Sequence, residues 1–279
     1  MKIAATRPLP GPAWDELEDV VLGERPDAEI LVVMNEPVAF DDYPQLRLVA
    51  NFSVGYDNID VEECRRRGIA VSNTPGVLDA ATADLAFGLI LAARRRIAEG
   101  DRAIRAGGWR LGGPAREVTG ATLAVIGMGR IGSAVARRAA GFDMRVVGVR
   151  SREGDLDDAL READVVSLHV PLSDLTRGLV SRGRLALLRD GATLVNTARG
   201  AVVDEEALVE ELASGRINAG LDVFVHEPHV PERLRDLPNV VLTPHIASAT
   251  VETRAAMTRV VVDNVLAFER GEPLLNPVM

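Results

Sequence analysis

The chain has 279 residues, of which 47% are apolar and 26% charged, as is typical of a globular protein with one large or two ordinary domains. The net charge of −9 disfavours a nucleic-acid partner, because basic faces bind phosphate backbones. Lys2 is the single lysine, which excludes a P-loop and disfavours Schiff-base chemistry. Cys64 is the single cysteine, so we expect a packed helical thiol, no disulfide within the chain and no metal site.

The apolar stretches are too short to span a bilayer, and the first residues lack the apolar segment of a secretory signal. We therefore expect a cytoplasmic protein without membrane association. The sequence shows no fixed-period repeat and no low-complexity tract.

The first part of the chain alternates short apolar runs with helical patterns. Such alternation predicts a parallel β-sheet with helices on its faces. The expected strands cover residues 2–6, 29–34, 46–50 and 69–72, and the expected helices cover residues 14–23 and 61–68.

A long helical pattern over residues 79–107 turns from apolar to charged near Arg94, where we expect the chain to cross between domains. The Gly-rich stretch 107–120 follows, and it predicts an irregular arm or linker with Trp109 against a neighbour. A second alternation of strands and helices comes next. Its expected strands cover residues 121–127, 144–149, 164–170, 192–196, 217–223 and 240–244.

The last helical pattern, over residues 249–271, has apolar positions at helical spacing. The first domain lacks a covering helix from its own segment, so we expect this helix to return to it. The predicted architecture is α/β, with two Rossmann-like domains on parallel sheets. A discontinuous substrate-binding domain comprises residues 1–91 and 251–279, and a dinucleotide-binding domain comprises residues 92–250.

A Gly-x-Gly-x-x-Gly turn follows the strand predicted at 121–127 and opens a helical pattern. Gly127 would permit the tight turn, Gly129 would let the backbone approach a pyrophosphate, and Gly132 would let the helix pack on the strand. The pyrophosphate would then lie on the unpaired N–H groups at the helix start. A glycine-rich strand–turn–helix without a ligand is the structural alternative.

The residues after the next predicted strand indicate which dinucleotide binds. An NAD site normally offers an acid to the ribose hydroxyls there. This chain offers Arg150, Ser151 and Arg152, which would bind a 2′-phosphate by charge-assisted hydrogen bonds. We therefore expect a preference for NADP(H). The alternative is a solvated basic loop beside Glu153, with NAD(H) accepted.

Three residues with complementary chemistry follow three other predicted strands, where ligands of open α/β sheets bind. Arg199 offers a planar fork for a carboxylate. His245 is the candidate proton donor to a carbonyl oxygen, and Glu227 would favour its charged form and fix the ring. Taken singly, each also fits a structural role: a surface arginine, a solvated loop acid and a histidine bonded to backbone.

Other polar residues have weaker claims to chemistry. The rivals of His245 are His226 and His229, which flank Glu227 in a proline-bounded loop. We expect His169 to serve as wall or core. Asp222 would hold the nicotinamide carboxamide or cap a turn.

The sequence resembles the D-isomer-specific 2-hydroxyacid dehydrogenases over essentially its whole length. Within that family it is most similar to the glyoxylate/hydroxypyruvate reductases. The segment before the glycine turn is shorter than usual, so we expect trimmed elements in the substrate domain. The shared segments, in order, are NFSVGYDNID, SNTPGVLDAATADLAFGLIL, IGMGRIG, NTARG, LDVFVHEP and LTPHIASAT.

The resemblance implies the same roles for Arg199, Glu227 and His245, and it also implies a homodimer. It adds substrate contacts from the backbone of Val54 and Gly55. The further cofactor contacts that it implies are Thr82, Arg130, Ile131, Thr197, Ala198 and Asp222.

We therefore expect NADPH-preferring reduction of a small 2-oxo acid, such as glyoxylate or hydroxypyruvate, to the D-2-hydroxy acid. One alternative is a dehydrogenase for another 2-hydroxy acid, such as phosphoglycerate. The other is a dinucleotide-sensing protein of the same fold without catalysis.

Overall fold

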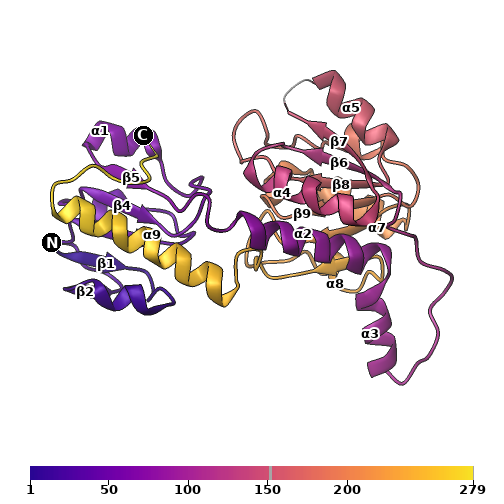
Figure 1. Cartoon of the computed structure of the whole chain (residues 1–279), viewed down its shortest axis with the longest axis horizontal. Helices are drawn as coiled ribbons and strands as arrows, with labels where there is room; N and C mark the ends of the chain where they lie inside the picture. Colours follow the sequence, from indigo (N-terminus) through magenta and orange to yellow (C-terminus); the bar gives the residue numbers. More distant parts are fainter. Residues whose placement is uncertain (151–152, 279) are drawn as a thin grey trace. The chain divides into compact units, whose positions relative to one another are not determined.

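The computed structural model describes residues 1–150 and 153–278, and the chain forms two compact units (Figure 1). The first unit comprises Met1–Leu78 and Ser248–Met279, and the second comprises Asp79–Ala247. Each contains one parallel sheet, so the predicted α/β class is confirmed.

The sheet of the first unit has the strand order β2-β1-β3-β4-β5. Its three central strands, β1, β3 and β4, are buried on both faces, as parallel sheets covered by helices require. Helix α9 (Val251–Glu269) packs on β4 and on η1 (Pro12–Glu16). The strands are β1 (Ile3–Ala5), β2 (Val20–Leu22), β3 (Ile30–Val33), β4 (Leu48–Asn51) and β5 (Ala70–Ser72).

The helix expected over residues 14–23 is wrong. The segment instead forms the short 3-10 helix η1 and then strand β2, which pairs in parallel with β1. Between them Asp19 adopts a positive φ of 53°, which interrupts any helix, and Arg25 holds its carboxylate at 2.9 Å. Val20 and Val21, the β-branched residues that begin β2, pair with β1. This strand pairing is more favourable than the helix that the amphipathic pattern predicts.

Other short elements of the first unit agree with the sequence. Helix α1 (Val61–Arg67) is N-capped by Asp60, which accepts a hydrogen bond from Glu63 N–H at 2.9 Å. Cys64 is buried on this helix, and burial raises the pKa of its thiol to about 11. The thiol is therefore a packing group, as expected. A further 3-10 helix, η2 (Phe40–Asp42), lies between β3 and β4.

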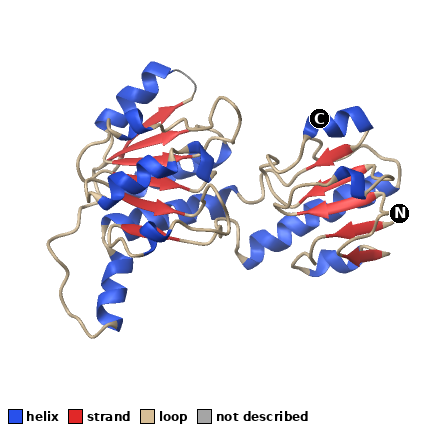
Figure 2. Cartoon of the chain, turned by 180° about the vertical axis from the view of Figure 1, so that it is seen from behind, coloured by secondary structure: helices blue, strands red, loops and turns tan. Residues whose placement is uncertain are grey.

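The sheet of the second unit has the order β11-β10-β9-β8-β6-β7, with every pair parallel. Helices lie along both of its faces (Figure 2). Alternate residues of β6 point to opposite sides: Ile126 joins one buried cluster, and Val125 joins the other. The strands are β6 (Thr122–Ile126), β7 (Arg145–Val149), β8 (Val165–Leu168), β9 (Thr193–Asn196), β10 (Asn218–Leu221) and β11 (Val240–Leu242).

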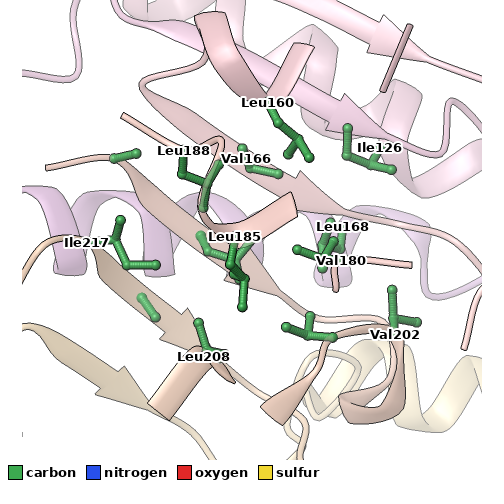
Figure 3. Packing of buried hydrophobic residues seen from close by; sticks show 14 of the residues in the cluster. Ile126, Leu160, Val166, Leu168, Val180, Leu185, Leu188, Val202, Leu208 and Ile217 are labelled. Carbon is green, nitrogen blue, oxygen red and sulfur yellow. The ribbon is translucent and has the colours of Figure 1, made fainter. Parts of the chain in front are cut away.

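One of these clusters fills the space between the sheet and the helices of one face (Figure 3). In it, Leu160 of α5 and Leu185 of α6 pack with Leu168 of β8, and all three are fully buried. The other face is covered by α2 and α4. The helices of this unit are α2 (Asp79–Arg94), α3 (Ile97–Arg105), α4 (Arg130–Ala139), α5 (Glu153–Glu162), α6 (Arg182–Leu185), α7 (Glu205–Ala213) and α8 (Glu232–Arg235), with the 3-10 helices η3 (Ala140–Phe142) and η4 (Gly200–Val202).

The helix expected over residues 79–107 is broken in two. Arg96 adopts a left-handed φ of 56° between α2 and α3, and its side chain bonds Glu99 and the carbonyl oxygens of Gly112 and Gly113. Residues 107–120 then form no regular element, as expected.

The division between units falls earlier than the boundary expected after residue 91. Helix α2 packs on α4 and on strands β9 and β10, so it belongs entirely with the second sheet. The C-terminal segment from Ser248 groups with the first unit instead. Within residues 1–150 and 153–278, no helix combines the length and apolar character needed to cross a membrane.

Candidate active site

The six parallel strands of the second unit all end at one edge, where the expected site residues follow them. The chain crosses from β7 at the end of the sheet to β8 on the other side of β6. The switch point of the topology therefore lies between β6 and β8, where open α/β sheets bind ligands.

The glycine turn after β6 has the shape that a dinucleotide needs. Gly127 has a φ of 98°, and a Cβ there would lie 2.4 Å from the carbonyl oxygen of His169. A Cβ on Gly132 would lie 2.0 Å from the carbonyl oxygen of Gly127. At Gly129, by contrast, a Cβ would meet no described atom within 4 Å, so the space beside this backbone is open.

The start of helix α4 is without a side-chain cap, because its N-cap residue is Gly129. The first N–H groups of a helix have no acceptor within it. Those of Arg130 and Ile131 lie at this N-terminus, where the helix dipole favours an anion. The turn thus fits the pyrophosphate of a dinucleotide.

Of the three residues expected to select between NAD and NADP, the structure describes only Arg150. Arg150 follows β7 and is exposed. Ser151 and Arg152 lie outside the described residues. Thr82 lies in the first part of α2 and is buried, with 4% of its surface exposed.

The turn after β9 is folded by Asn196. Its side-chain amide donates to the carbonyl oxygen of Arg199 at 2.8 Å, and its Oδ1 accepts from Ala198 N–H at 3.0 Å. Arg199 is half-buried. Thr197 has a buried hydroxyl without a hydrogen-bond partner among the described residues. The turn is thus shaped by its own polar groups.

Gly200 connects this turn to the loop after β10. A Cβ on Gly200 would lie 2.1 Å from the carbonyl carbon of Phe224. The N–H of the next residue, Val225, donates to Glu205 Oε1 at 3.0 Å, and Glu205 begins helix α7. Asp204 caps that helix, since its Oδ1 accepts from Ala207 N–H at 3.0 Å. The loop that carries Glu227 is therefore tied to the arginine turn.

Glu227 and His245 form a close pair. The Nδ1 atom of His245 lies 2.6 Å from Oε2 of Glu227, and Oε1 accepts from Phe224 N–H at 3.0 Å. Burial raises the pKa of Glu227, but its bonds to His245 and Phe224 and the charge of Arg199 outweigh burial and lower it. The carboxylate therefore stays ionised at neutral pH, beside the ring and within the field of the guanidinium.

The backbone of His245 adopts a left-handed φ of 52°, which is unusual for a non-glycine residue. Asp222 stabilises this turn: its carbonyl oxygen accepts from His245 N–H at 2.9 Å, and its carboxylate accepts from Ile246 and Ala247 N–H, each at 2.9 Å. Thr243 adds a hydroxyl bond of 2.5 Å to the same carboxylate. Both carboxylate oxygens of Asp222 thus cap the turn.

The other three histidines occupy places that differ from that of His245. His169 Nε2 lies 2.8 Å from Ser167 Oγ, and burial lowers the pKa of His169 to about 4, so it is neutral at pH 7. His226 and His229 are exposed and close a tight turn through a backbone bond of 2.7 Å.

Val54 and Gly55 lie in the first unit, in the loop after β4. Three bonds hold the carbonyl oxygens of this loop: Thr74 N–H bonds Ser53 at 3.0 Å, and the amides of Asn73 and Asn51 bond Val54 and Gly55 at 2.9 and 2.8 Å. Among the described residues the N–H groups of Val54 and Gly55 have no acceptor. These two adjacent N–H groups, in a loop whose carbonyl oxygens are held in place, are therefore available as donors to an anion.

Sequence reasoning missed several residues that shape these turns, foremost Asn51, Asn73, Asn196 and Thr243. Each directly follows or ends a strand, which is the one signal that could have found them. Their contribution depends on which loop folds back over them.

Comparison with known proteins gives concordant matches. Residues 87–247 match the family model of the NAD binding domain of D-isomer specific 2-hydroxyacid dehydrogenases. A glyoxylate reductase of Pyrococcus furiosus is 46% identical, over 93% of this chain and 86% of its own length. A crystal structure of a protein from Thermus thermophilus covers 100% of both chains at 43% identity and a TM-score of 0.91. An NADPH-dependent glyoxylate/hydroxypyruvate reductase of Sinorhizobium meliloti, solved with NADP and malonate, is 36% identical over 99% of this chain and 96% of that chain, with a TM-score of 0.88.

Proposed function

The chain belongs to the D-isomer specific 2-hydroxyacid dehydrogenase family, and from this premise we propose that it uses NADPH to reduce glyoxylate to glycolate and hydroxypyruvate to D-glycerate. The family makes it an oxidoreductase with a nicotinamide dinucleotide cofactor. The observation that carries the proposal is the 2.6 Å contact between His245 and Glu227, with the charge of Arg199 acting on the same carboxylate.

The three side chains divide the work of the reaction. Arg199 holds the substrate carboxylate by paired N–H bonds, a geometry that lysine cannot reproduce. His245 donates a proton to the oxygen that gains charge as the carbonyl is reduced. Glu227 fixes the ring by its Nδ1 contact, so that Nε2 is the nitrogen left for the substrate.

A bound reduced nicotinamide supplies the hydride for the carbonyl carbon. The open side of Gly129 and the uncapped start of α4 are the groups that would hold its pyrophosphate. Gly127 and Gly132 keep the turn tight enough for this approach. The remaining cofactor contacts that we propose are Thr82, Arg130, Ile131, Thr197, Ala198 and Asp222.

The preference for NADPH rests on Arg150, Ser151 and Arg152. Arg150 is exposed after β7, the strand whose end meets the adenosine ribose in this fold. Two guanidiniums favour a 2′-phosphate over a ribose hydroxyl. The ratio of kcat/KM for NADPH and NADH tests the preference, and a clear preference for NADH would refute it.

The first unit would contribute the N–H groups of Val54 and Gly55 to the substrate carboxylate. These two N–H groups lack acceptors among the described residues, so a carboxylate would satisfy them. We assign this unit, which includes α9, as the substrate-binding domain, and the second unit as the dinucleotide-binding domain.

A homodimer completes the proposal. Helix α3 and the loop after it extend from the body of the second unit (Figures 1 and 2). They leave Ile97 56%, Ile104 53% and Trp109 87% exposed, which is unusual for large apolar side chains unless a partner covers them. Light scattering should give a dimer for the wild type and a monomer for the variant with Ile97, Ile104 and Trp109 changed to serine. A wild-type monomer at micromolar concentration would exclude this arrangement.

A panel of 2-oxo acids with each reduced cofactor tests the function itself. Glyoxylate and hydroxypyruvate should be reduced, and His245→Ala should lower turnover by a factor on the order of 10² to 10⁴, as for lost general-acid catalysis. Cofactor binding without turnover of any 2-oxo acid would favour a dinucleotide sensor. Higher efficiency with another 2-oxo acid would name a different dehydrogenase of the same family.

A further inference from the structure

The guanidinium of Arg254 makes no ion pair with a carboxylate among the described residues of the first unit. Its side chain is half-buried, and the Cζ atom lies 5.4 Å from the centre of the Phe52 ring. Among the described residues no carboxylate or carbonyl accepts from this guanidinium. The ring can stabilise one face of the cation, but the five N–H groups in its plane still need acceptors.

Two further features make the position of Arg254 unfavourable for a cation. It lies near the start of α9, where Thr250 caps the helix and where the helix dipole is positive. Burial, and then the neighbouring charge of Arg7, lower the pKa of Arg254. A half-buried cation at a positive helix end, beside a second cation, would be stabilised by an anion that a ligand supplies.

Arg7 has a partner of its own, so the surplus charge is that of Arg254. Glu36 bonds Arg7, and its Oε2 also accepts from Met34 N–H at 2.9 Å. This cluster follows β1 and β3, which are the strands between which the order of the first sheet switches. Ligands of open α/β sheets bind at such switch points.

The backbone around Arg254 is held in place. Thr258 donates from its hydroxyl to the carbonyl oxygen of Pro10 at 2.5 Å. A Cβ on Gly11 would lie 3.0 Å from Cα of Ala255, so the chain before η1 lies directly on the helix. The guanidinium is thus held next to Phe52, which begins the loop that contains Val54 and Gly55.

We propose that Arg254, with Arg7 beside it, is an anion subsite for a second charged group of the substrate. This inference rests on the proposed function, since it adds a distal subsite to a 2-oxo acid site. The group recognised is a carboxylate or a phosphate at the end of the molecule opposite the 2-oxo carboxylate. Both offer oxygen acceptors that match a guanidinium fork.

Two matched pairs of substrates test the subsite and identify its anion. The first pair is 2-oxoglutarate and 2-oxopentanoate, which differ by the distal carboxylate. The second is 3-phosphohydroxypyruvate and hydroxypyruvate, which differ by the phosphate. For at least one pair, wild-type kcat/KM should be higher for the charged member, and Arg254→Met should lower that ratio about 10- to 100-fold, as for a lost charge-assisted hydrogen bond.

Two control variants separate charge from folding. Arg254→Lys keeps the charge and should retain part of the ratio. Arg259→Met removes an arginine further along α9 that pairs with Glu16 and with Asp263, the latter at 2.8 Å, and it should leave the ratio unchanged. Thermal stabilisation by 2-oxoglutarate or 3-phosphohydroxypyruvate in the presence of NADP⁺ gives a readout that needs no turnover, and Arg254→Met should abolish it.

The outcomes are distinguishable. Equal efficiency for both members of both pairs, or an equal loss of all four substrates in Arg254→Met, would overturn the subsite and leave Arg254 a support for Phe52. Failure of the wild type to reduce glyoxylate or hydroxypyruvate would instead overturn the proposed function. Stabilisation by the charged ligands that depends on Arg254 would then still uphold the anion subsite.

Discussion

The backbone N–H of His245 donates a hydrogen bond to the carbonyl oxygen of Asp222 at 2.9 Å. The carboxylate of the same aspartate accepts from the backbone of the two residues after the histidine. One buried residue therefore fixes the left-handed turn that presents the proposed proton donor. This role needs no cofactor, and it adds to the nicotinamide contact proposed for Asp222.

Asp222→Asn should disturb this turn, although the asparagine side chain has nearly the same size as that of aspartate. Oδ1 accepts from Thr243 and Ile246, so the new amide would face Ala247 N–H, and two donors would meet. The free energy of unfolding should fall by about 1–3 kcal/mol, as for a buried group left unsatisfied. Urea denaturation measures this, with Asp204→Asn as the control because asparagine also caps a helix. Equal stability of the two variants would show that Asp222 does not hold the turn.

Glu227→Gln should lower kcat/KM about 10- to 100-fold, because the ring loses the anion that stabilises its charged form and keeps only a weaker partner. The carboxylate has a lowered pKa, so its protonation should not limit wild-type activity above its ordinary value of 4.5. A pH profile of kcat/KM measures both effects, with the exposed Glu232→Gln as the control. A profile identical to that of the wild type would remove Glu227 from the mechanism.

Arg199→Lys should weaken substrate binding while leaving the cofactor in place. Lysine keeps the charge but loses the planar fork, so we expect kcat/KM for glyoxylate to fall about 10- to 100-fold. The dissociation constant of NADPH, measured by fluorescence, should change little. Arg182→Lys serves as the control, because that arginine makes an exposed ion pair with Glu210 that lysine can keep. Equal losses for substrate and cofactor would make Arg199 a structural residue.

The sequence predicted the parallel strands and the glycine turn because both depend on short-range patterns. Apolar runs such as that of β6 are buried on both faces wherever the rest of the chain goes. The same reasoning failed over residues 14–23, where the sequence has a helical pattern but part of the segment forms strand β2 and pairs with β1. It also failed at Arg96, whose left-handed backbone is stabilised by the distant carbonyl oxygens of Gly112 and Gly113.

For the candidate site too, some features could be predicted from the sequence and others could not. Arg199, Glu227 and His245 could be chosen because each follows a strand that ends at a predictable edge. The contacts that shape their turns could not, since they join residues far apart in sequence, as in the bond from Thr243 to Asp222. The sequence also could not show that Arg254 lacks an ion-pair partner, because its neighbour Phe52 lies far from it in sequence.

Gly200→Ala tests the link between the arginine turn and the Glu227 loop. The new methyl group would lie 2.1 Å from the carbonyl carbon of Phe224, so the loop must move. We expect the free energy of unfolding to fall by about 1–3 kcal/mol, as for overpacking, and activity to fall with it. Gly88→Ala on helix α2 is the matched control, because a Cβ there meets nothing within 4 Å and should stabilise slightly. A fully active Gly200→Ala enzyme would show that the loop can shift without harm.

Glu36 should make the first unit sensitive to acid. Burial raises the pKa of Glu36, but the N–H of Met34, its own N–H and the charge of Arg7 outweigh burial and hold that pKa at about 2, below its ordinary value of 4.5. A depressed pKa means that the unfolded chain binds the proton more readily. The stabilisation is therefore complete above pH 4.5 and is lost as the pH falls towards about 2.

Glu36→Gln should remove this stabilisation and its pH dependence together. Because the carboxylate is partly exposed, we expect a loss of only about 1 kcal/mol at pH 7 after allowance for solvent screening. The difference in unfolding free energy between wild type and variant should shrink between pH 4.5 and about 2. Urea denaturation across this range measures it, with Glu62→Gln on the exposed face of α1 as the control. A difference that stays constant with pH would show that the ionised carboxylate of Glu36 is not what stabilises this turn.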